Sequence, residues 1–70
     1  MTFTTLRQFR LHQGVSQSFM AKRLGIHRVT YMNYELGRNH PPASFYYQLA
    51  HEFRYPVEQI LPLAEPNGVK

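Results

Sequence analysis

Cysteine is absent from this 70-residue chain. The sequence therefore offers neither a disulfide framework nor a thiolate nucleophile, and its composition suits a reducing compartment. No apolar run approaches the roughly 20 residues of a membrane-spanning helix. The first residues also lack the basic-then-apolar layout of a signal peptide. We therefore expect a soluble, cytoplasmic protein.

Acidic residues are scarce and are confined to one part of the chain. All four acids lie at or after position 35. The preceding segment contains no acid and five basic residues, which are Arg7, Arg10, Lys22, Arg23 and Arg28. Such a one-sided positive charge favours a polyanionic partner, because each phosphate that is neutralised releases a condensed counterion. A solvated basic surface without a partner is the alternative that charge alone leaves open.

The sequence also lacks a recognisable catalytic or metal-binding set. The spacing of its four histidines fits no zinc pattern, and no cysteine or nearby carboxylate completes a site. No Ser/His/Asp combination can be assigned to one pocket. We therefore expect no metal, no cofactor and no enzymatic activity.

The spacing of apolar residues predicts helices and no strands. Apolar side chains recur three and four positions apart, whereas alternation with period two is nowhere sustained. Glycine or proline separates the helical segments, with Ser16 and Ser44 as expected N-caps. Pro56 is expected to begin the last helix and Pro62 to end it. The sequence thus predicts an all-α domain of five short helices over residues 1–62 and a flexible C-terminal tail over residues 63–70.

The connection between the second and third helices is very short. It consists of Gly25, Ile26 and His27. A turn of this length forces a steep crossing between the two helices, which is the construction of a helix-turn-helix pair. Tyr31 and Tyr34, three residues apart on the third helix, are its expected inward pair.

Residues 15–37 resemble the helix-turn-helix of the phage-repressor and Cro family, which is XRE-like. The matching positions are Ser16-Gln17, Ala21, Leu24-Gly25, Tyr34-Glu35 and Gly37. Later residues match that family's fourth and fifth helices, so the resemblance covers about residues 3–61. It implies a lambda-repressor-like fold and a sequence-specific transcriptional regulator that binds double-stranded operator DNA.

The resemblance implies that the third helix enters the major groove. Five residues would then face the base edges: His27, Arg28, Val29, Met32 and Asn33. Arg28 suits guanine and Asn33 suits adenine, while Val29 and Met32 suit thymine methyl groups. A solvated charge or a phosphate contact is the alternative for Arg28. Core packing or a protein partner is the alternative for Met32.

Phosphate contacts are implied at Ser16, Gln17, Arg38 and Asn39, partly because helix N-termini attract phosphate. A capped surface helix and an unpartnered loop are the alternatives. The family position of Gln17 can also brace the third helix.

The resemblance further implies a structural ion pair between Arg10 and Glu35, with a nitrogen–oxygen separation of about 4 Å or less.

Two residues depart from the family pattern. His27 is a poor N-cap, so the start of the third helix is expected to be weakly held without DNA. Leu36 is apolar at a position where the family usually has a polar residue. Its side chain is expected to contact either a partner protomer or the sugar-phosphate edge of DNA.

Family members usually act as two-fold dimers on palindromic sites, with half-sites about 34 Å apart. The resemblance therefore implies a weak homodimer and a phage or bacterial repressor-like regulator in the cytoplasm. A protein-interaction regulator on the same fold, antitoxin-like or antirepressor-like and with weak or no specific DNA binding, is the alternative reading.

Overall fold

The computed structural model describes residues 3–64, and within them all regular structure is helical. The elements are α1 (Leu6–Gln13), α2 (Gln17–Leu24), α3 (Arg28–Leu36), α4 (Ala43–Phe53) and α5 (Val57–Ile60), which continues into a 3-10 turn (Leu61–Ala64). The predicted all-α, five-helix architecture is confirmed. Residues 65–70 of the expected tail lie outside the described residues.

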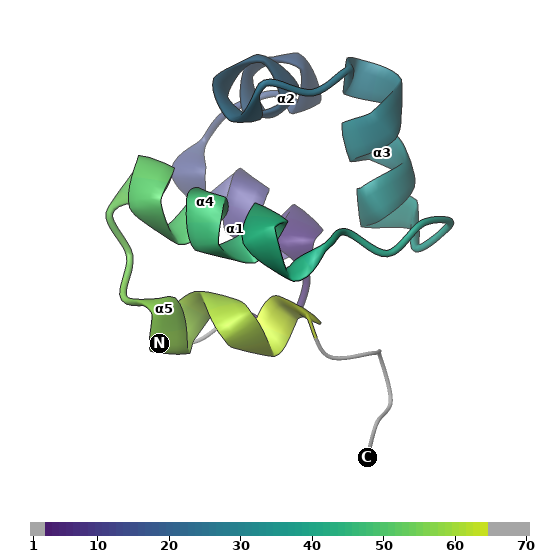
Figure 1. Ribbon diagram of the computed structural model, residues 1–70. Helices are drawn as coiled ribbons and strands as arrows, with labels where there is room; N and C mark the ends of the chain where they lie inside the picture. Colours follow the sequence, from purple (N-terminus) through teal and green to yellow (C-terminus); the bar gives the residue numbers. More distant parts are fainter. Residues whose placement is uncertain (1–2, 65–70) are drawn as a thin grey trace.

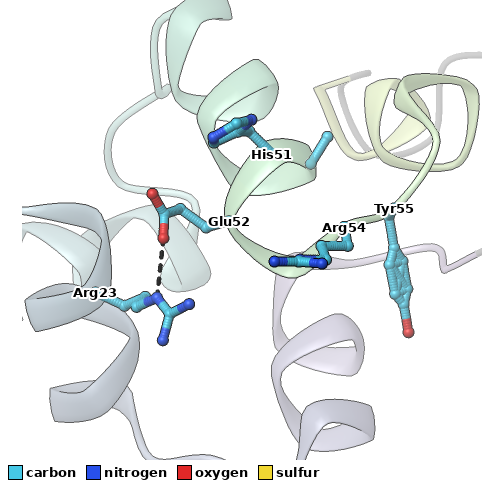
Figure 2. A pocket seen from close by; sticks show the side chains of 6 residues that line it. Arg23, His51, Glu52, Arg54 and Tyr55 are labelled. Carbon is cyan, nitrogen blue, oxygen red and sulfur yellow. Dashed lines mark hydrogen bonds and ion pairs between the residues drawn. The ribbon is translucent and has the colours of Figure 1, made fainter.

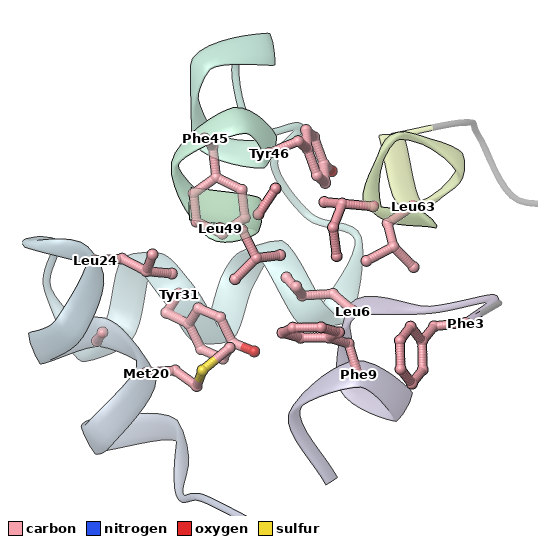
Figure 3. Packing of buried hydrophobic residues seen from close by; sticks show 13 residues of the cluster. Phe3, Leu6, Phe9, Met20, Leu24, Tyr31, Phe45, Tyr46, Leu49 and Leu63 are labelled. Atoms are coloured by element: carbon pink, nitrogen blue, oxygen red, sulfur yellow. The ribbon is translucent and has the colours of Figure 1, made fainter. Parts of the chain in front are cut away.

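The helices enclose one core to which every helix contributes a fully buried side chain: Phe9, Met20, Tyr31, Leu49 and Ile60. Figure 3 shows Tyr31 and Met20 on one side of this core and Phe9 on the other, with Leu49 between the helices. In Figure 1, α2 and α3 occupy one end of the molecule, α1 and α4 its centre, and α5 the opposite end. The core therefore fixes α3 through its inner side only.

The second helix begins and ends as its sequence predicts. Ser16 Oγ accepts a hydrogen bond from Phe19 N at 3.0 Å, which satisfies a free donor at the helix start. Gly25 follows the helix in the left-handed conformation, with φ of 73°. Ile26 N then donates to Ala21 O at 2.9 Å and closes the helix. The short turn thus holds α2 and α3 at a fixed crossing.

The start of α4 differs from the prediction. The helix begins at Ala43 with Pro42 as N-cap, so Ser44 lies inside its first turn rather than capping it. The proline pair explains the difference. Pro42 has an extended backbone, and its carbonyl oxygen already accepts from Phe45 N at 2.9 Å.

The end of the last helix also differs. The α-helical hydrogen bonds stop at Ile60, but the chain stays helical through Pro62 as a 3-10 turn. Proline has no N–H to donate to the carbonyl four residues back, so the chain tightens instead of unwinding. Leu63, which the sequence assigned to the tail, is buried in the core.

Arg54 ends α4 in the left-handed conformation, with φ of 59°. Tyr55 N donates to Ala50 O at 2.9 Å, so this helix closes as α2 does at Gly25. A non-glycine residue is strained in this conformation.

No helix within residues 3–64 is long and apolar enough to cross a membrane.

Candidate nucleic-acid interface

The pair α2 and α3 forms the helix-turn-helix, and α3 lies at the edge of the molecule (Figure 1). The two helices pack closely, with Met20, Leu24 and Tyr31 between them (Figure 3). Ala21 is also buried in α2. Because this packing uses only the inner side of α3, the rest of the helix surface is left open.

The two faces of α3 differ in exposure and in chemistry. Tyr31 is fully buried, and Tyr34 packs against the core. By contrast, 55% of Val29 and 59% of Leu36 are exposed to solvent. The residues that the sequence placed at base edges have mixed exposure: His27 and Arg28 are exposed, while Met32 and Asn33 are half-buried.

An ion pair inside the domain fixes the inner face of α3. Arg10 Nε lies 2.6 Å from Glu35 Oε2, within the separation that the family resemblance implied. A second donor of Arg10 lies 3.4 Å from Glu35 Oε1, and a third donates to Val15 O at 3.0 Å. Only 11% of the Arg10 side chain and 3% of the Glu35 side chain are exposed. The pair therefore ties α3 to α1 from within.

Gln17 adds α2 to this network. Its side-chain amide donates to Glu35 Oε1 at 3.1 Å. One carboxylate at the end of α3 thus accepts hydrogen bonds from both of the preceding helices. The bracing role that the resemblance implied for Gln17 is present in the structure, and the second amide hydrogen remains available to another acceptor.

The surroundings of Glu35 keep it ionised. Burial would raise the pKa of this carboxyl, but hydrogen bonds, chiefly from Arg10, outweigh burial and lower the pKa below its ordinary value. Burial and the neighbouring Glu35 carboxylate raise the pKa of Tyr31, so that phenol stays neutral. The carboxylate is therefore charged, paired and directed away from the outer face of α3.

The start of α3 lacks a side-chain cap. His27 has the extended backbone of an N-cap residue, and its carbonyl accepts from Tyr31 N at 3.0 Å. Its imidazole makes no capping hydrogen bond, as expected from the sequence. The first backbone N–H groups of α3 are consequently free to bind solvent or a ligand.

The loop after α3 presents the other expected phosphate contacts. Arg38 N donates to Asn33 O at 3.0 Å, which holds the loop against the end of the helix. The side chains of Arg38 and Asn39 are exposed, as is Ser16 at the start of α2. These groups are accessible, while Gln17 is half-buried by its contact with Glu35.

A second ion pair joins α2 to α4 and was not anticipated from the sequence. Arg23 Nε lies 2.9 Å from Glu52 Oε1 beside a shallow hollow that His51, Arg54 and Tyr55 also line (Figure 2). The two partners are separated by 29 positions, and no motif links them, so only the fold brings them together.

Within residues 3–64, no three histidine or acidic side chains gather as metal ligands.

The crossing of α2 and α3, their short turn and the open outer face of α3 define a helix-turn-helix DNA-binding domain. A family model described as helix-turn-helix matches residues 6–60. The chain therefore belongs to this family, the XRE family of helix-turn-helix proteins, and is a DNA-binding transcriptional regulator.

Two curated relatives come from Archaeoglobus fulgidus, and each is an uncharacterized HTH-type transcriptional regulator. Each is 32% identical to this chain over 57 residues. The match covers 81% of this chain and 81% of the first relative, or 80% of the second. No solved structure gives a significant match.

Proposed function

We propose that the protein is a cytoplasmic, sequence-specific regulator of the repressor/Cro kind, and that α3 enters the major groove of double-stranded operator DNA. One observation carries this proposal. The inner face of α3 is locked by Tyr31 and Glu35, while its outer face stands clear of the core. A rigid helix with a free face is what reading a groove requires.

Base contacts are assigned to His27, Arg28, Val29, Met32 and Asn33. The guanidinium of Arg28 can donate two parallel hydrogen bonds to guanine, and the amide of Asn33 can donate to and accept from adenine. Both lie on α3 with Val29, and Arg28 is exposed whereas Asn33 is half-buried. The exposure of Arg28 supports its assignment, since its side chain has no internal hydrogen-bond partner among those found in residues 3–64.

Phosphate contacts are assigned to Ser16, Gln17, Arg38 and Asn39. The Ser16 hydroxyl can donate to a phosphate while its oxygen keeps the cap to Phe19 N. Gln17 retains one amide hydrogen beyond its bond to Glu35. These groups flank α3 at the start of α2 and in the following loop, the positions that would fix the helix in its groove.

We further propose a weak homodimer on a palindromic operator, with half-sites about 34 Å apart. The competing function is a protein-interaction regulator, for which the exposed Tyr47 of α4 is the supporting observation. The two functions differ in what they predict for duplex DNA.

Selection of bound sequences from a random duplex pool tests the proposal. Enrichment of a defined site is expected, with an affinity that falls steeply as salt rises. Arg28→Ala should lower specific affinity by about 5–150-fold and relax preference at one base pair. Arg54→Asn is the matched control, because it removes one exposed charge from the far end of α4 and asparagine tolerates a positive φ. No enrichment at moderate salt would leave the protein-interaction function in its place.

A further inference from the structure

Three apolar side chains share one side of α3, and we call Val29, Met32 and Leu36 the apolar stripe; Val29 and Leu36 are exposed, and Met32 between them is half-buried. Their spacing of three, four and seven positions places them on one side of the helix. None of them belongs to the hydrophobic core or packs against it. Leu36 is the most exposed of the large apolar residues in the described chain, and Val29 is the next.

The polar groups around this stripe include hydrogen-bond donors and carry no free negative charge. Arg28 lies at its start and Asn33 beside its centre, both on α3. The carboxylate of α3, Glu35, is turned inward and held by Arg10. The face therefore combines an apolar line with groups that suit a polyanion.

We propose that the operator half-site presents thymine methyl groups on neighbouring base pairs to the apolar stripe, so that the affinity for DNA depends on those methyl groups. This inference rests on the proposed function of α3. The C5 methyl of thymine is the apolar group that base edges offer in the major groove. It is therefore a suitable partner for apolar side chains such as the exposed Val29 and Leu36 on a reading helix.

The dimensions of the stripe agree with this assignment. Seven residues of helix from Val29 to Leu36 span about 10 Å, which corresponds to about three base-pair steps of roughly 3.4 Å. A helical side chain leans toward the N-terminus and covers the preceding turn, so Leu36 reaches back over Met32 rather than beyond the helix end. The stripe is thus long enough for at least two neighbouring thymines.

A protein partner fits this surface less well. Three side chains provide far less area than the roughly 800 Å² that each partner buries in a stable protein interface. Arg28 and Asn33 would also be left without acceptors if the cover were apolar. A partner protomer and the sugar-phosphate edge were the two contacts expected for Leu36 from the sequence. Because Leu36 lies on the same side of α3 as Val29 and Met32, the proposal instead places thymine methyl groups against its side chain.

The experiment uses the duplex enriched from the random pool and the full chain. Each thymine of the site is replaced singly by deoxyuridine, which removes the methyl group but keeps Watson–Crick pairing. At least two neighbouring positions should each weaken binding by about fourfold, the loss expected for one buried methyl-sized group.

Val29→Ala and Leu36→Ala identify which side chain meets which methyl group. Each variant should bind the thymine site several-fold more weakly and should lose its sensitivity to deoxyuridine at one position. Leu11→Ala is the matched control, because Leu11 is 51% exposed but lies on α1. It should change neither the affinity for the thymine site nor the loss of affinity that deoxyuridine causes.

The possible failures are distinguishable. Enrichment of a site that tolerates deoxyuridine at every position would overturn the thymine inference and leave the proposed function standing. Sensitivity to deoxyuridine that both Val29→Ala and Leu36→Ala retain would likewise overturn the assignment to the stripe. Failure to enrich any duplex would remove the proposed function together with this inference.

Discussion

Replacing Arg10 by methionine removes the guanidinium but keeps most of the apolar length of the side chain. Glu35 would then be left with only 3% of its side chain exposed and with the amide of Gln17 as its remaining donor. Breaking a buried pair by removal of one partner costs about 3–5 kcal/mol. A domain of this size has a free energy of unfolding of about 3.5–10 kcal/mol. The variant should therefore lose a large part of its stability, with a fall in Tm of at least about 12 °C.

A double-mutant cycle separates the ion pair from the cost of each replacement. Arg10→Met and Glu35→Leu are made singly and together, and the free energy of unfolding is measured by urea titration with circular dichroism. The double variant contains no unpaired buried charge, so it should be more stable than the sum of the single losses predicts. We expect a coupling energy of at least about 2 kcal/mol.

The same chain offers a matched control in its second ion pair. The side chains of Arg23 and Glu52 are 49% and 29% exposed, and their separation of 2.9 Å is nearly as short. An exposed pair is screened by solvent, so Arg23→Met and Glu52→Leu should couple by no more than about 1 kcal/mol. Equal coupling energies in the two cycles would refute the reasoning, because burial would then not decide the strength of either pair.

Three further outcomes are expected. The pKa of Glu35 in the folded protein lies below its ordinary value of 4.5. Its contribution to stability is therefore complete above pH 4.5 and is lost as the pH falls through the folded pKa. The urea midpoint should drop on acidification, and Glu35→Leu should reduce that drop. His27→Ser supplies the missing cap and should raise the free energy of unfolding by about 1 kcal/mol. In hydrogen exchange, the amides of Val29 and Thr30 should gain protection in that variant, and in the unaltered chain when operator DNA is added. Arg54→Gly relieves a positive φ and should stabilise by about 0.5–1 kcal/mol, whereas Arg54→Ala should not.

The sequence predicted those helix ends that local chemistry determines. Ser16 caps α2 because its hydroxyl reaches a backbone N–H three residues on, and Gly25 ends it because glycine accepts a positive φ. Ser44 has the same chemistry, but the proline pair before it starts the helix earlier. The end of α4 at Arg54 could not be predicted in this way, since an arginine adopts the left-handed conformation only when the packing on both sides requires it.

The polar network divides in the same way. The contact between Arg10 and Glu35 followed from the family resemblance, in which both positions recur together. The contact between Arg23 and Glu52 depends on how α2 meets α4, which no spacing within the sequence encodes. Burial at Leu63 was missed for a related reason, because a proline in a 3-10 turn does not divert the chain from the core.

Under the proposed function, the two faces of α3 separate stability from recognition. Its inner face carries Tyr31 and Glu35, whose contacts reach α1 and α2 and set the angle of the helix. Its outer face carries Val29 and Leu36, which contribute little to the core. A change on the outer face can therefore alter the DNA sequence that is read without unfolding the domain, because exposed positions away from buried networks rarely change stability by more than about 0.5 kcal/mol. A change on the inner face should alter both properties at once, since it would move the helix that we propose reads the DNA.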